Sequence, residues 1–274
     1  MRLGYPRRLN GFLSVLAILG CVLAPARAQA STIVTFDGTG VQDGSVTYSI
    51  SGNTLKITLT NTAVYAPHQS ITPTDALTGV VFKLPTGITL TPVSAALPTG
   101  SAIVQSARCS GPCAGQTNVG GEFGYATTFA GGPANVNAGI GSSGQIAGTA
   151  NFNGANLDGQ AAPDGVNFGL VGSTVGSQYM SANANPNGGL QKVPLIESSV
   201  TFTLTIMGGT LLANQITNWA LVFGTAWGEG TVTTGVITAG AADVTNPEPA
   251  TLLLLGTGLT GAALTLRRRK TIRS

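Results

Sequence analysis

Charged residues are scarce in this chain of 274 residues. Asp, Glu, Lys and Arg make up 8% of it, against about a quarter of an average soluble domain. Between residues 31 and 246 there are four cations, Lys56, Lys83, Arg108 and Lys192, and nine acids, a net charge of −5. Nucleic-acid binding requires clustered cations that neutralise phosphates. We therefore expect no nucleic-acid partner.

Residues of the kinds that act as catalytic groups in hydrolases are equally rare. His68 is the single histidine, Asp75 follows it seven residues later, and no Gly-x-Ser-x-Gly elbow occurs. No pair of acids stands out for glycoside hydrolysis, which needs two carboxylates across a cleft. We therefore expect no enzymatic activity, and a hydrolase is our third-ranked hypothesis.

Long helical periodicity is missing from residues 31–246, where apolar residues instead alternate with Ser and Thr. In "SVTYSISGNTLKITLTN" two alternating runs flank Gly52-Asn53, which predicts a hairpin. About ten such segments predict an all-β fold, an antiparallel β-sandwich over residues 31–245. We expect strands at residues 32–36, 45–50, 55–59, 78–84, 87–93, 101–107, 121–129, 198–206, 218–226 and 230–238.

The segment from about 131 to 189 is rich in Gly and Asn, which predicts ordered loops with short strands inserted at an edge of the sandwich. Its oxygen-bearing side chains are weak candidates for calcium ligands: Asn151, Asn153, Asn156, Asp158 and Asp164. Calcium prefers such ligands in loops, but the spacing is not that of an EF-hand. Asx-turns explain the same residues without a metal, so we expect no cofactor and keep calcium as an alternative.

Two cysteines, Cys109 and Cys113, lie in the body, and a third, Cys21, lies near the N-terminus. Paired thiols of exported proteins tend to form disulfides. We predict a Cys109–Cys113 bond closing a small loop around Gly111-Pro112. A metal site would need more ligands, and a redox pair usually has two intervening residues.

The first thirty residues predict a signal peptide. A basic segment precedes an apolar run, residues 12–23, which is too short to span a bilayer comfortably. Cleavage after Ala28 or Ala30 fits the Ala-x-Ala pattern. An alternative is lipidation of Cys21, which follows Ile-Leu-Gly. In either case the signal predicts export through the inner membrane by way of signal peptidase.

Sixteen uncharged residues, 251–266, precede four cations, Arg267, Arg268, Arg269 and Lys270. A helix of this length spans about 24 Å, somewhat less than the hydrocarbon core of a bilayer. Cations remain on the cytoplasmic side, so the body would face outward. A buried helix of a soluble domain is the alternative, although the segment has no amphipathic face.

The complete tail, 246–274, resembles the PEP-CTERM sorting signal of Gram-negative bacteria. Pro247, Glu248 and Pro249 form the motif, and the apolar segment and Arg cluster follow in order. The resemblance implies that exosortase, a membrane transpeptidase-like enzyme, cuts near the motif, after a transient stay in the inner membrane. It also implies a surface or extracellular destination, in bacteria that make exopolysaccharide and biofilm matrix.

These features favour a non-catalytic cell-surface or extracellular-matrix protein. The alternative is a carbohydrate-binding adhesin or lectin-like module, with or without calcium, that contacts exopolysaccharide. Trp219 and Trp227 are expected in the core or at its rim, with sugar stacking as the other option. Two "LPTG" segments, 84–87 and 97–100, resemble a Gram-positive sortase signal but predict Pro-x-Gly turns between strands.

Overall fold

A computed structural model describes much of the β-rich part of the chain. All described residues belong to residues 29–241, one of the two compact units of the chain. They are residues 31–38, 41–65, 71–104, 109, 113, 115–129, 132–143, 145–146, 149–150, 157, 166–173, 190, 193–225, 229–233 and 235–239. The expected signal peptide and sorting tail, His68, Trp227 and all five calcium candidates lie outside them.

The first sheet, sheet A, has six strands that are all paired antiparallel. In order across the sheet they are β16 (Gly235–Ala239), β1 (Ser31–Phe36), β2 (Gly44–Ser51), β3 (Thr54–Asn61), β13 (Ser199–Met207) and β5 (Thr89–Ala96). The β2–β3 hairpin turns through Gly52, whose φ is 53°. A glycine with positive φ at this position suits a two-residue hairpin loop, as the sequence predicts.

The second sheet, sheet B, is centred on β4. Its main path is β15 (Gly230–Val232), β14 (Thr217–Phe223), β4 (Leu77–Lys83), β11 (Leu170–Val171), β12 (Leu195–Glu197) and β6 (Ala102–Val104). β8 (Ala138–Gly141) pairs with β4 and with β7 (Gly124–Ala126). β11 and β12 are parallel, while the other described pairs of this sheet are antiparallel.

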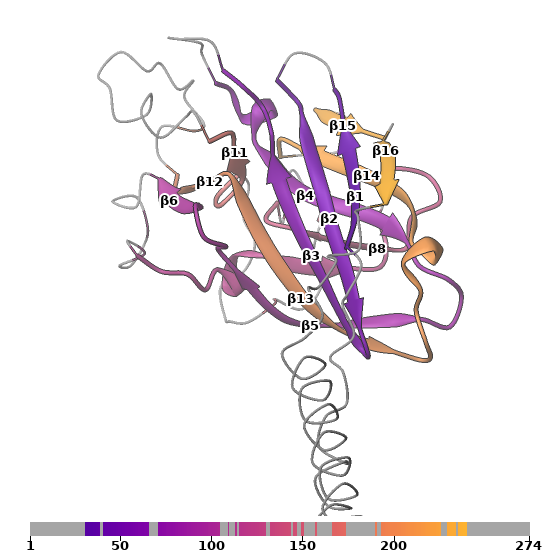
Figure 1. The fold of residues 1–274 in the computed structure, drawn as a ribbon. Helices are drawn as coiled ribbons and strands as arrows, with labels where there is room; N and C mark the ends of the chain where they lie inside the picture. The colour runs from indigo at the N-terminus through magenta and orange to yellow at the C-terminus, as the bar shows by residue number, and fades with distance from the viewer. Residues whose placement is uncertain are drawn as a thin grey trace, which may run out of the picture. The chain divides into compact units, whose positions relative to one another are not determined.

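Short elements complete the described fold. β9 (Gln145–Ile146) pairs with β10 (Thr149–Ala150), and there are three 3-10 turns, η1 (Pro73–Asp75), η3 (Gly120–Glu122) and η4 (Ala213–Gln215). Figure 1 shows sheets A and B as two layers. No helix among the described residues is long and apolar enough to cross a membrane.

The core lies between the two sheets. Sheet A contributes alternate residues, such as Leu55, Ile57 and Leu59 of β3, which are all fully buried. Trp219 of β14 packs between Tyr48 of β2 and Phe82 of β4, with ring centroids 4.9 and 4.6 Å apart. These aromatic contacts connect sheet A to sheet B, so burial between the layers holds the sandwich together.

Sheet B is buried on both faces. In β4, every residue from Leu77 to Phe82 is buried. Its second face packs in a separate cluster that contains Val81, Ala220 and Val222, against which Phe129 also lies. Burial on both faces explains why "GVVF", residues 79–82, has no polar side chain, whereas apolar residues alternate with hydroxyl residues in the strands of sheet A.

The structure confirms the all-β, two-sheet architecture and differs from the expected organisation in three places. Within residues 121–129, predicted as one strand, only Gly124–Ala126 form a strand, because Gly120–Glu122 form the 3-10 turn η3. Residues 230–238, predicted as one strand, form two strands: β15 joins sheet B and β16 joins sheet A. The glycine-rich segment is not simply an insertion at an edge, because β8 pairs with the central strand β4. Gly139 lies against Val81 there, at a distance that leaves no room for a Cβ atom.

Both "LPTG" segments are turns, as the sequence predicts. The Ile88 amide donates to Pro85 O at 3.2 Å, and the Ser101 amide donates to Pro98 O at 3.1 Å. Gly87 and Gly100 have φ of 86° and 90°, the left-handed backbone that a type II turn requires at its third position. Each of these glycines therefore lies in the turn between two consecutive strands.

Two buried tyrosines carry shifted pKa values. Burial, the largest cause in both, raises the pKa of Tyr65 and of Tyr125 from 10.0 to about 12. At Tyr125 a backbone hydrogen bond with Leu90 partly offsets the rise, whereas the buried hydroxyl of Tyr65 has no hydrogen-bond partner among the described residues. The folded protein therefore favours the neutral phenols.

We predict that replacing Trp219 with Ala lowers the free energy of unfolding by about 3–5 kcal/mol, because the ring leaves a cavity between the sheets. Urea denaturation of the purified body measures this. Met207→Ala is the matched control, since Met207 is 50% exposed and its loss costs at most about 0.5 kcal/mol. Equal losses in the two variants would contradict the assignment of Trp219 to the core.

We also predict that stability decreases in alkali. A group whose pKa is raised by folding stabilises the folded state fully below its unfolded pKa and loses that contribution as the pH rises. For Tyr65 and Tyr125 the loss runs from pH 10 to about pH 12. Urea midpoints across this range, with tyrosinate absorbance, measure it. Tyr125→Phe should flatten the decrease, and an unchanged slope would contradict the prediction.

Candidate functional site

The outer surface of sheet A carries mainly hydroxyl side chains, with Val93 of β5 and Met207 of β13 as exposed apolar residues beside them. The hydroxyl side chains come from five neighbouring strands, at positions that alternate with buried residues. We call this surface the hydroxyl face, and its members are Thr35, Ser45, Thr47, Ser49, Ser51, Thr54, Thr58, Thr60, Thr91, Ser94, Thr201, Thr203 and Thr205. The sheet thus presents short uncharged donors and acceptors in a regular array.

Strand register arranges these hydroxyls in rows across the sheet. Thr58 lies between Thr47 on β2 and Thr201 on β13. The hydroxyls of Thr58 and Thr201 are 2.8 Å apart and share a hydrogen bond. Rows follow at a spacing of about 4.8 Å between strands and about 6.7 Å between alternate residues. The array is therefore a property of the sheet rather than of one loop.

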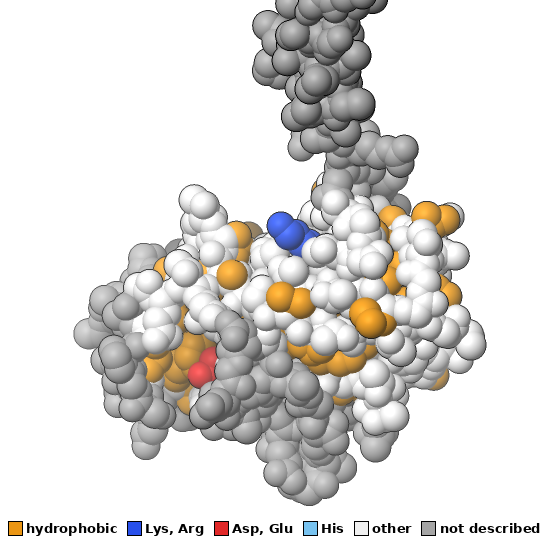
Figure 2. Space-filling model, turned by 90° about the horizontal axis from the view of Figure 1, so that it is seen from below, with side chains coloured by type: hydrophobic (Ala, Val, Ile, Leu, Met, Phe, Trp, Pro, Cys, Tyr) orange, Lys and Arg blue, Asp and Glu red, His pale blue; other side chains and the backbone are white. Residues whose placement is uncertain are grey.

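Charge is nearly absent from the hydroxyl face. Lys56, which lies between Ser49 and Thr203, is the one charged side chain among the described outward positions of β1, β2, β3, β5 and β13. Figure 2, which views the molecule from below rather than onto this face, shows little blue or red among the described side chains, with orange apolar patches beside the white atoms. Such a surface cannot attract ions strongly, and it suits hydrogen bonding to a neutral, hydroxylated partner.

Sequence reasoning recognised the strands but missed the hydroxyl face as a site. The signal was available in "SVTYSIS", "TLKITLTN" and "SVTFTLTI", where the residues that alternate with apolar ones along the strand are nearly always Ser or Thr. What the sequence could not supply was the order of strands, which brings β2, β3 and β13 side by side.

Asp75 serves as a structural cap. Its carboxylate accepts hydrogen bonds from the Thr72 amide at 2.8 Å and from the Thr72 hydroxyl at 2.9 Å, at the start of η1. Its sequence neighbour His68 lies outside the described residues. Within the described ranges no three His, Cys, Asp or Glu side chains lie close enough to hold a metal ion.

Trp219 has the core position that the sequence predicts. It is 4% exposed, and its ring is enclosed by Tyr48 and Phe82. A side chain so placed cannot stack on a sugar, which requires an open aromatic face. The other described aromatics are buried as well, except Phe129, which is partly buried.

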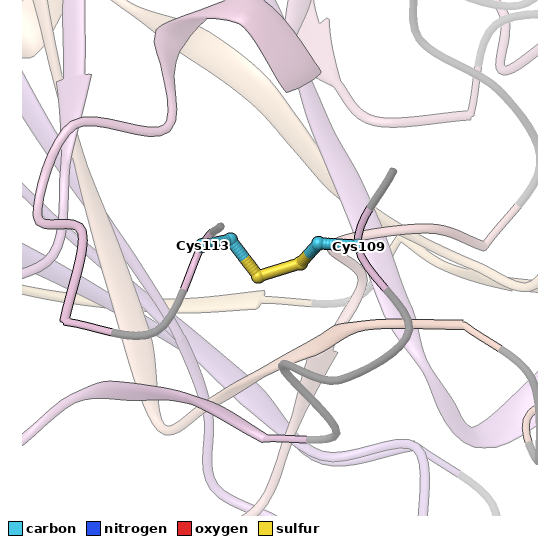
Figure 3. Close-up of a disulfide and its surroundings, with 2 residues drawn as sticks. All are labelled: Cys109 and Cys113. Carbon is cyan, nitrogen blue, oxygen red and sulfur yellow. A yellow bond between two sulfur atoms is a disulfide. The ribbon is translucent and has the colours of Figure 1, made fainter. Parts of the chain in front are cut away.

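Cys109 and Cys113 form a disulfide, as the sequence predicts, with Cα atoms 6.0 Å apart (Figure 3). Cys113 is buried, and Cys109 packs against the core. After the bond the chain runs beside β5, where the Leu97 amide donates to Thr117 O at 2.8 Å. The bond therefore fixes a segment that covers part of the free edge of sheet A, a protected arrangement for an edge strand.

The comparisons with known proteins concern the tail. Residues 247–270 match the family model of the PEP-CTERM protein-sorting motif, which is the resemblance found in the sequence. No curated protein and no solved structure matches the chain. The matched segment contains Pro247, Glu248 and Pro249 and the cations Arg267 to Lys270. The chain is therefore a PEP-CTERM domain-containing protein, with the signal by which exosortase substrates are recognised.

Proposed function

We propose that this chain is a non-catalytic protein of the cell surface or extracellular matrix, which exosortase detaches from its C-terminal anchor. The sorting motif at 247–270 is the observation that carries the proposal. A signal peptide in residues 1–30 would start export, and signal peptidase would remove it. The cations at 267–270 would hold the tail with its end in the cytoplasm.

The folded body is suited to that destination. Its largest hydrophobic cluster lies between the sheets, Cys109 and Cys113 are bonded to each other, and sheet A presents an almost uncharged surface. A disulfide persists in oxidising compartments outside the cytosol. A hydroxyl surface remains hydrated without binding counter-ions, which suits a protein embedded in a neutral polysaccharide matrix.

A second candidate function is glycan binding, and the hydroxyl face favours it. Ser and Thr lose little side-chain entropy when they are fixed, and each hydroxyl both donates and accepts. A neutral polysaccharide lying across β2, β3 and β13 would meet rows of such groups. Because Trp219 is buried, its ring cannot stack on a sugar, so recognition would depend on hydroxyl contacts rather than on stacking at that residue.

We predict that the mature protein recovered from the host lacks both ends. Mass spectrometry should find an N-terminus after Ala28 or Ala30 and a C-terminus near Pro247 to Pro249. Deletion of the exosortase should leave the tail attached and the protein in the membrane fraction. A mature chain outside the cell that still carries residues 252–273, with no dependence on exosortase, would contradict the proposal.

For the second candidate, we predict retention of the purified body on neutral glycans of an array. Replacing Thr58, Thr201 and Thr203 together with Val removes three hydroxyls while keeping branched strand residues, and should reduce retention by about tenfold or more, since each lost hydrogen bond contributes about 1 kcal/mol. The same three residues changed to Ser keep their hydroxyls and serve as the control.

Equal retention of the Val and Ser variants would exclude the hydroxyl face as the binding site. Absence of retention by the unaltered body would overturn the candidate itself. A parallel array with a chelator tests the calcium candidates Asn151, Asn153, Asp158 and Asp164, because only calcium-dependent retention would disappear there.

A further inference from the structure

The two ends of the folded body meet in one pair of strands. β1 is the first described strand and β16 is the last, and they pair antiparallel in sheet A, with Thr32 opposite Ala239. The chain therefore enters and leaves the body at neighbouring backbone positions.

The spacers outside this pair differ in length. Ser31 already pairs with Ser49, so cleavage after Ala28 or Ala30 leaves two residues or none before the sheet begins. On the other side, residues 240–246, seven positions, separate Ala239 from the sorting motif. Only the C-terminal cleavage segment has a spacer of several residues.

This difference has a mechanical consequence. Backbone groups that are bonded in a sheet cannot at the same time bond to the substrate groove of a peptidase. The signal cleavage segment directly adjoins β1, so β1 must be unpaired while that cut is made. Seven residues can reach at most about 25 Å, which lets the Pro-Glu-Pro segment enter a membrane enzyme while β16 remains paired.

Pairing of β16 is also favoured once β1 is in place. Val34 and Phe36 of β1 are 1% and 3% exposed. Gly235 of β16 lies directly against them, since a Cβ atom there would meet Val34 Cγ1 at 2.7 Å and Phe36 Cε1 at 2.8 Å. Separation of β16 would remove a backbone that lies against both of these core side chains, so the apolar contact favours a docked β16.

We infer that the body is processed in a fixed order: signal cleavage, then pairing of β1 with β2 and β16, then the exosortase cut on the folded body. The inference rests on the proposed export and sorting. Each cut breaks one peptide bond. At the first, water adds, the signal peptide keeps the carboxylate and the body gains an amine. At the second, the tail leaves with the new amine and the body keeps the acyl carbon, which passes to water or to an amine acceptor.

A disulfide across the pair tests whether β16 is docked during the second cut. Ile33 and Thr238 are register partners, and Cα separations of antiparallel partners, about 4.5–5.5 Å, suit a disulfide. The full-length double variant Ile33→Cys and Thr238→Cys should form the bond after export and should lose its tail at the rate of the unaltered protein. The two single variants are controls. A locked protein that accumulates with its tail attached would overturn the inference.

The length of the spacer provides a second test. Deleting residues 241–244 leaves three spacer residues, which reach about 10 Å. Tail removal should slow by tenfold or more, because a linker this short keeps the cleavage segment of a folded body out of the active site of exosortase. Adding Gly235→Val, which undocks β16 through the clash with Phe36, should restore removal. Normal removal from the deletion variant alone would show that β16 is undocked at the cut, and would overturn the inference.

Pulse-chase labelling in the host separates this inference from the proposed function. Samples treated with protease should show loss of the signal first, protease resistance of the body second and loss of the tail third. A tailless species that is still protease-sensitive would overturn the order. If no tail is removed even from the unaltered protein, the proposed sorting fails, and the order fails with it.

Discussion

Burial of apolar side chains between sheets A and B is the constraint on which the rest of the structure depends. Once Leu55, Ile57 and Leu59 face the core, the period of a strand sends the residues between them outward. The hydroxyl face is therefore the other half of the same sequence pattern that builds the core. The enclosure of Trp219 by Tyr48 and Phe82 anchors the layers and, for the same reason, removes Trp219 from any surface role.

Local patterns predicted the parts of the fold that are held locally. The β2–β3 hairpin and the turns at Gly87 and Gly100 depend on neighbouring residues, so their sequence signals were sufficient. The prediction of one strand over residues 230–238 was wrong because β15 pairs with the preceding strand β14 in sheet B, whereas β16 pairs with β1, from the other end of the body, in sheet A. Nothing in those nine residues indicates that their first part pairs in sheet B and their last part in sheet A.

The candidate site shows the same division. Alternation predicted that Thr58 and Thr201 are outward-facing strand residues, yet their hydrogen bond at 2.8 Å joins residues that are 143 positions apart. Only the strand order turns separate Ser and Thr residues into one surface. The disulfide was predictable because Cys109 and Cys113 are four positions apart. The sorting motif was predictable for another reason, since an enzyme recognises it as a linear segment.

Long-range pairing also gives a physical reason for an anchor at the C-terminus. Sheet A is completed by β13 and β16, which pair with β3 and β1 from the other end of the chain. Such pairs form slowly and only after the whole body has crossed the membrane. Until then, β1 and β3 present unpaired backbone groups that favour aggregation. A tether that lasts until β16 has paired keeps each incomplete body apart from its neighbours, and a spacer outside β16 permits release as soon as the sheet is complete.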